Sequence, residues 1–177
     1  MSKKKSNIRA STGININVPI EKIWQLLAVE FADIGKWASG VDASEGSGAP
    51  INGSSCSERA CKISATGFSD TKERIVIYDK GGYLLKYTLF HGLPGFVKDA
   101  YNTWQLFPKN DTTTLVKAHT EMRATGIMGA MMKGFMTRST QKVLVAMCEE
   151  LKHYAENGEP HPNKVKAIVK YNRKKKK

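Results

Sequence analysis

Residues 99–136 have the sequence DAYNTWQLFPKNDTTTLVKAHTEMRATGIMGAMMKGFM, and this stretch decides the fold. DAYNTWQLFP (99–108) and TTTLVKAHTEMRA (112–124) have the composition of strands and flank the short turn KND. A turn of this length between two strands predicts an antiparallel pair. A helix is expected to begin directly afterwards, at about Gly126. The stretch therefore predicts a β-hairpin that leads straight into a helix.

More strands are expected upstream of this hairpin. Over residues 14–18, isoleucine and valine alternate with asparagine, as in a strand with one buried face. Short turns, ATGFS and Gly81-Gly82, join the later segments and indicate an antiparallel meander. The expected upstream strands cover residues 8–18, 55–63, 70–79 and 83–90, with a further short strand near Val41.

Helices are expected at three places. Two short ones follow the first strand, at IEKIWQLLAVEF (20–31) and ADIGKW (32–37), where apolar side chains recur at helical spacing. The long helix should run from residue 126 to 157, because Gly158 and Pro160 follow it as stop signals.

This order of elements predicts an α+β fold. A curved antiparallel sheet of about six or seven strands has one face to bury, and only the long C-terminal helix remains to cover it. A helix is a cylinder of about 10 Å diameter, so a sheet wrapped around it leaves space. That space is either filled by large side chains or forms a cavity for a small molecule. Residues 8–158 are expected to form this one domain.

An ordered set of residues in this domain carries a family pattern. Its members are Val18-Pro19, Ile23-Trp24, Leu26-Leu27, Phe31, Trp37, Gly53, Arg59, Glu73, Asp79, Tyr87, Gly92, Pro94, Trp104, Pro108 and 113–116. The chain resembles the SRPBCC superfamily, which includes START-like lipid-transfer domains, and most closely its small polyketide cyclase/dehydrase-like members. The resemblance covers nearly all of residues 8–158. It implies a helix-grip fold with a hydrophobic cavity between the sheet and the C-terminal helix.

Arg59 and Glu73 are the first candidate site residues. They are equally distant from position 66, so a hairpin centred there would place them opposite each other. Two roles stay open for the pair. It is either a structural salt bridge across two strands or, if both side chains face the interior, an anchor for the polar end of a ligand.

The other candidate residues lie on the faces that the resemblance turns inward. Residues two apart share one face of a strand, and the helix shows an apolar stripe at steps of three or four. Besides the Arg59–Glu73 pair, the expected ligand-contacting residues are Leu85, Tyr87, Leu89, Asn102, Trp104, Leu106, Val116, Thr120, Met128, Met132 and Phe135. They form either ordinary core or the wall of a cavity, and methionine suits both.

The function expected from this resemblance is the binding or transport of a small hydrophobic or amphipathic molecule. Loops at residues 91–95 and 46–53, together with the start of the long helix, would gate entry. The alternative is a cyclase, dehydratase or isomerase acting on a small ketide-like compound, with Glu73 or Tyr87 as the acid–base group. No cofactor or metal is expected, because the sequence contains no metal-binding spacing, phosphate loop or nucleophile motif.

The charge of the chain is concentrated at its two ends. The net charge is +12, and residues 3–5 and 164–177 hold 11 of the 28 basic residues, which leaves 17 basic residues against the 16 acidic ones, all of which lie between Glu21 and Glu159. Such basic tails, residues 1–7 and 159–177, are either solvated ends or contacts for anionic lipid or nucleic acid.

The sequence also predicts a cytoplasmic protein. Its three cysteines form no C-x-x-C pair, and the N-terminus lacks the apolar run of a secretory signal. No stretch approaches the roughly 18 apolar residues of a membrane span.

Overall fold

The computed structural model describes residues 5–63 and 70–175. The expected turn ATGFS, residues 65–69, lies outside these ranges. In chain order the described elements are β1 (Lys5–Ile16), α1 (Ile20–Trp24), the π-helical η1 (Gln25–Val29), the 3-10 helix η2 (Phe31–Lys36), β2 (Val41–Ser47), β3 (Glu58–Ile63), β4 (Thr71–Asp79), β5 (Leu84–His91), β6 (Val97–Asn110), β7 (Thr113–Thr125), α2 (Gly126–Asn157) and α3 (Pro162–Lys175).

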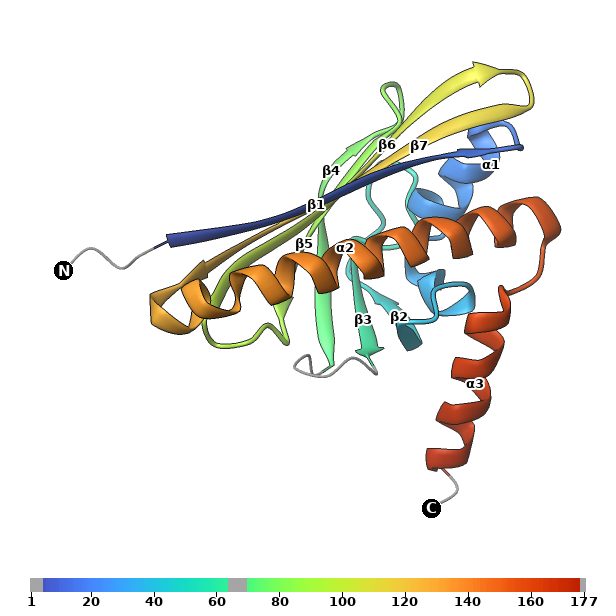
Figure 1. Cartoon of the computed structure of the whole chain (residues 1–177). Helices are drawn as coiled ribbons and strands as arrows, with labels where there is room; N and C mark the ends of the chain where they lie inside the picture. Colours follow the sequence, from blue (N-terminus) through green and yellow to red (C-terminus); the bar gives the residue numbers. More distant parts are fainter. Residues whose placement is uncertain (1–4, 64–69, 176–177) are drawn as a thin grey trace.

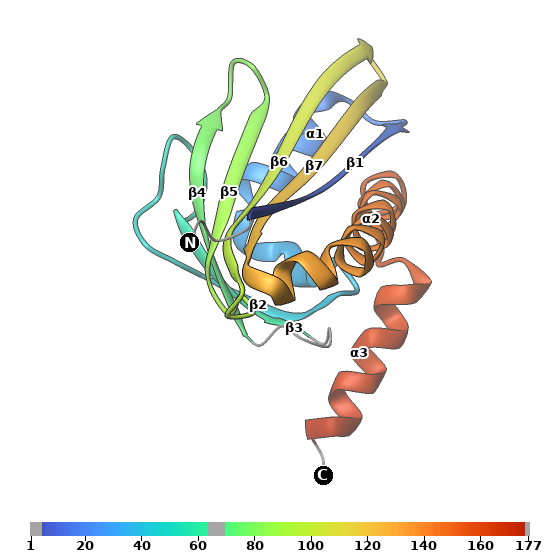
Figure 2. The ribbon, with the colours of Figure 1, turned by 60° about the vertical axis from the view of Figure 1, so that its left-hand side comes forward.

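The strands of the described residues form one seven-stranded sheet. Its order is β1-β7-β6-β5-β4-β3-β2, and all neighbouring strands are antiparallel. The sheet curves, with α2 running along it and α1, η1 and η2 held within the curve (Figure 1, Figure 2). The expected α+β helix-grip fold is therefore confirmed, including the two short helical segments after the first strand.

The buried residues of the sheet and helices form two clusters. The large cluster joins α1, η1 and η2 to the inward faces of the strands and to the second half of α2, through residues such as Trp24, Phe31, Trp104 and Leu151. The small cluster lies under the first half of α2. It consists of Ile8, Val97, Ala100, Met122, Ala124 and Met136, with Leu89, Leu93, Phe96 and Met132 packed against it.

The first half of α2 is rotated relative to the expected stripe. Met128 and Phe135 are 55% and 67% exposed, so the expectation that they face the interior is wrong. The buried residues of the helix are instead Gly129, Met136, Leu144, Cys148, Glu150, Leu151 and Ala155. Gly129 explains the difference, because a Cβ placed there would lie 2.9 Å from the Cβ of Ala124. The helix therefore lies too close to Ala124 at this position for any residue larger than glycine.

Side chains of α2 also cover the open edge of β1. The amide of Gln141 accepts a hydrogen bond from the Ser11 backbone N–H at 3.2 Å and donates one to the Ser11 carbonyl at 3.0 Å. Further along the strand, Lys152 Nζ donates to the Asn15 carbonyl at 2.7 Å. These contacts satisfy backbone groups that no neighbouring strand reaches.

The C-terminal segment, expected to be only a basic tail, contains helix α3. Lys164 anchors this helix, because its Nζ donates a hydrogen bond to the carbonyl of Val41 on β2 at 2.6 Å. Burial lowers the pKa of Lys164, although the carboxylates of Asp42 and Glu150 oppose that shift. Beyond its first turn, α3 extends away from the sheet (Figure 1).

The N-terminal tail is shorter than expected. Residues 5–7, assigned to that tail from the sequence, pair with residues 123–125 of β7 and belong to β1. Among the described helices, none is both long enough and apolar enough to cross a membrane.

The position of α2 predicts a large loss of stability at one residue and almost none at its neighbour. Leu144 is 3% exposed and Val143 is 50% exposed. Leu144→Ala should lower the free energy of unfolding by about 2–5 kcal/mol, because it leaves a cavity between helix and sheet. Val143→Ala should change it by less than about 0.5 kcal/mol. Urea denaturation of both variants measures the two values, and equal losses would contradict this placement of the helix.

Candidate functional site

The interior of the sheet contains a buried ion pair between Arg59 and Glu73. These residues lie opposite each other on β3 and β4, as their symmetric spacing predicted. Arg59 Nε donates to Glu73 Oε2 at 2.5 Å, and Arg59 Nη1 donates to the carbonyl of Phe31 at 2.7 Å. The pair therefore ties the first residue of η2 to β3 and β4.

The guanidinium of Arg59 also lies against two aromatic rings. Its Cζ is 4.0 Å from the ring centroid of Phe31 and 4.8 Å from that of Tyr87. Burial disfavours the charge, but the Glu73 carboxylate, together with Tyr87 and Cys61, outweighs this effect and raises the pKa of Arg59 above its ordinary value. Arg59 is therefore a permanent positive charge inside the protein.

One donor of this guanidinium is unused. Arg59 Nη2 is buried and has no hydrogen-bond partner among the described residues. Arg59 borders a void of about 10 Å³, which is about the size of one water molecule. The side chains around the void are those of Leu26, Leu27, Ile34, Trp37, Arg59, Leu85, Tyr87 and Trp104.

The void brings together several of the expected site residues and adds others. Arg59, Leu85, Tyr87 and Trp104 border it, and Glu73 holds Arg59 in place. Leu26, Leu27, Ile34 and Trp37 were not expected there, although the family pattern includes three of them. The apolar spacing of residues 20–37 indicated a buried helix face but not what that face would contact.

Tyr87 is the second polar group at the void. Trp104 Nε1 donates to its hydroxyl oxygen at 3.4 Å, which supplies the partner that a buried phenol requires. Burial raises the pKa of Tyr87 to about 12, and Glu73 contributes to that shift. The phenol is therefore neutral near pH 7 and keeps its proton as a hydrogen-bond donor.

The remaining expected residues lie around this centre or between the clusters. Leu106 and Val116 are buried in the large cluster but do not border the void, and Leu89 packs against both clusters. Thr120 Oγ1 donates to Asn102 Oδ1 at 2.6 Å, at strand positions that fall between the two clusters. A polar pair thus separates the compact large cluster from the methionine-containing small one.

The two loops expected to gate entry do not form one entrance. Gly92 lies beside Asp70 and Thr71, at the start of β4, whereas Gly53 lies near Tyr78, at the end of that strand. Phe96, the residue that follows the first loop, lies at the start of α2, where the backbone N–H of Thr125 donates to its carbonyl at 2.9 Å. Leu93 and Phe96 from this region pack against the small cluster, and so does Met132 from α2. The small cluster is therefore the part of the interior nearest to the first loop and to the start of α2.

No metal centre or reactive thiol is evident in the described part of the chain. No group of three or more His, Cys, Asp or Glu side chains there could hold a metal ion. Burial raises the pKa of Cys61 and of Cys148 to about 12, so both stay protonated thiols near pH 7.

A curved sheet that grips a long helix around a mostly apolar interior defines the START-like class of proteins. Residues 7–156 match the family described as polyketide cyclase / dehydrase and lipid transport, and the chain belongs to this family. No curated protein matches the chain in sequence.

Solved structures share the fold at low sequence identity. XoxI from Bacillus cereus has a TM-score of 0.66 at 16% identity, covering 87% of this chain and 99% of its own. A START superfamily protein from Mycobacterium smegmatis has a TM-score of 0.61 at 14% identity, covering 80% and 94%. Norcoclaurine synthase from Thalictrum flavum, in complex with dopamine and hydroxybenzaldehyde, has a TM-score of 0.59 at 16% identity, covering 85% and 86%. At these identities the likeness shows the fold alone.

The ion pair predicts a non-additive pattern of stability. Glu73→Gln should lower the free energy of unfolding by about 3–5 kcal/mol, because it leaves a buried guanidinium charge without its partner. The double variant Arg59→Met/Glu73→Leu should lose less, since both charges are removed together.

The exposed pair on the same two strands supplies the matched control. Arg74 Nε donates to Glu58 Oε1 at 2.6 Å, and the two side chains are 56% and 28% exposed. Glu58→Gln should cost about 0–1 kcal/mol in urea denaturation. A Glu73→Gln variant that loses no more than Glu58→Gln would refute the structural importance of the buried charge.

Proposed function

We propose that the chain binds one small amphipathic molecule between the sheet and α2, with the polar end of the molecule on Arg59. The unused donor Arg59 Nη2, buried beside apolar and aromatic side chains, carries this proposal. A buried charged donor without an acceptor is unfavourable by about 1–3 kcal/mol. A carbonyl or carboxylate oxygen of a ligand would satisfy it, and the proton of Tyr87 is a second donor nearby.

Binding requires the interior to open. Drug-sized ligands occupy about 300–1,000 Å³, far more than the 10 Å³ void beside Arg59. The small cluster is where we expect space to form, because Met132, Met136 and Phe96 can change rotamer without breaking buried hydrogen bonds. Affinity then falls in proportion to the small fraction of molecules that are open.

The family description supports this proposal, because it includes lipid transport. The class of ligand we propose is an apolar molecule carrying one hydrogen-bond acceptor.

We propose that the protein works in the cytoplasm, since Cys56, Cys61 and Cys148 are all free and buried.

Two adjacent methionines on α2 provide a test with the dye 1-anilinonaphthalene-8-sulfonate. Met132 packs against the small cluster, whereas Met131 is 75% exposed. Met132→Trp should weaken dye binding by about tenfold or more, because the larger side chain fills the space that the ligand needs. Met131→Trp should leave the affinity unchanged.

Dye fluorescence titrations of the three proteins, with circular dichroism to verify folding, measure these affinities. Equal affinities in folded Met132→Trp and wild-type protein would contradict binding beneath α2. Competition by dodecanoic acid against dodecanol tests the polar anchor. Wild type should prefer the acid, and Arg59→Met/Glu73→Leu should lose that preference.

An enzyme of the cyclase or dehydratase type is the second candidate. The family description includes cyclases, and the neutral phenol of Tyr87 next to Arg59 is a suitable proton donor for a carbonyl oxygen. On this hypothesis, Tyr87→Phe would lower the kcat for cyclisation of a short poly-β-ketone thioester by about 10²–10⁴-fold and leave dye binding intact. Turnover that is absent in wild type, or unchanged in Tyr87→Phe and in Glu73→Gln, would rule out this role.

A further inference from the structure

Helix α3 is attached to the domain at one end only. Lys164 is the one residue of the helix that is buried among those described, and it is held by the Val41 carbonyl. The region that matches the family ends at residue 156, so α3 lies outside it. The helix is therefore an addition to the family fold, and most of its surface contacts nothing in the described part of the domain.

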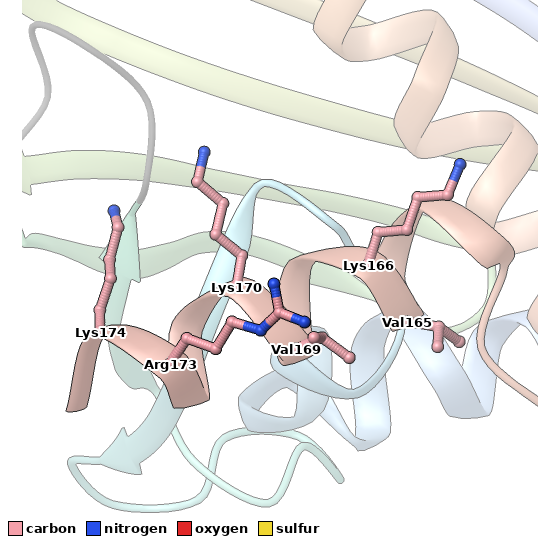
Figure 3. A pocket seen from close by; sticks show the side chains of 6 residues that line it. All are labelled: Val165, Lys166, Val169, Lys170, Arg173 and Lys174. Atoms are coloured by element: carbon pink, nitrogen blue, oxygen red, sulfur yellow. The ribbon is translucent and has the colours of Figure 1, made fainter. Parts of the chain in front are cut away.

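The free surface of α3 combines apolar and basic side chains. Val165, Ile168 and Val169 are 48%, 38% and 46% exposed, and their spacing of three and four places them on one side of the helix. Lys166, Lys170 and Lys174 project in a row next to them (Figure 3). No acidic residue occurs between Pro162 and Lys175.

This arrangement is unfavourable in water alone. A helix of 14 residues is near the lower limit of stability without a partner. Lysines four residues apart repel one another and weaken it further. An anionic surface would remove the repulsion, and an apolar layer next to that surface would cover the three aliphatic side chains.

We propose that α3 docks the protein on the surface of a lipid bilayer that contains anionic lipid. Val165, Ile168 and Val169 enter the headgroup boundary, while Lys166, Lys170, Arg173 and Lys174 bind the phosphate and carboxylate groups. The charge of the helix is complementary to such a surface. The aliphatic stripe favours lipid over nucleic acid, because nucleic-acid surfaces that bind single strands pair basic residues with aromatic rings for stacking.

Co-sedimentation of the full chain with vesicles tests the proposal. Wild type should bind vesicles of phosphatidylcholine mixed with phosphatidylserine, and bind those of phosphatidylcholine alone much more weakly. Lys166→Glu/Lys170→Glu/Lys174→Glu should reduce the affinity by about a hundredfold or more. Glutamate has nearly the helix propensity of lysine, so the helix itself should persist.

Two further variants separate the contribution of the α3 lysines from that of net charge alone, and measure the contribution of the aliphatic side chains. Lys80→Glu/Lys109→Glu/Lys98→Glu makes the same change in net charge at exposed positions of β6 and of the turn after β4, and should bind as wild type does. Val165→Thr/Val169→Thr keeps the shape and charge of α3 and should weaken vesicle binding by about tenfold.

Several results would overturn the proposal. These are equal binding to both kinds of vesicle, no vesicle binding at all, or equal losses in the two lysine-to-glutamate variants. Binding of the α3 lysines to an oligonucleotide without binding to vesicles would assign the helix to nucleic acid instead. None of these readouts depends on a ligand in the interior, so this proposal and the proposed function can fail separately.

Discussion

The buried guanidinium of Arg59 is the constraint on which the interior depends. A charge in an apolar region must be paired, and Glu73 on the neighbouring strand supplies the partner. The same side chain donates to the carbonyl of Phe31, so η2 is tied to β3 at this point, and Ser44 on β2 makes a second link to the helix through Gly35 and Ala32. The aromatic rings of Phe31 and Tyr87 complete its surroundings. The interior is thus organised around a polar centre, and the apolar side chains pack about it.

The sheet was largely predictable from the sequence, whereas the face of α2 was not. Alternation with period two and short turns define strands and their pairing, which is why Arg59 and Glu73 could be placed opposite each other. Helix rotation depends on closest approach, and Gly129 decides it through its lack of a side chain. The spacing of the large apolar residues therefore predicted a buried face that included Met128 and Phe135, but both side chains face solvent. Leu26 and Trp37 border the void because residues 25–37 pack against distant strands of the sheet. The periodicity of a segment does not predict which distant segment it will contact.

The two clusters divide the domain into a compact part and an adaptable part. Around Arg59, aromatic rings and an ion pair fill nearly all the space between sheet and helices. Under the first half of α2, the space is filled by methionine side chains and by Leu93 and Phe96, with fewer specific contacts. Asn102 and Thr120 mark the boundary between the parts. Rearrangement of the adaptable part would leave the polar centre unchanged, and this separation suits a family whose members share a fold while differing in activity.

An open sheet has two edges whose unpaired backbone groups can recruit a strand from another molecule. Here β1 and β2 are those edges. The amide of Gln141 hydrogen-bonds both the N–H and the carbonyl of Ser11, as a neighbouring strand would, and Lys152 donates a hydrogen bond to the carbonyl of Asn15. At the opposite edge, Lys164 occupies the carbonyl of Val41. Long polar side chains from two helices thus block strand addition at these positions, and the same lysine that attaches α3 helps to keep the sheet from extending into a neighbouring copy.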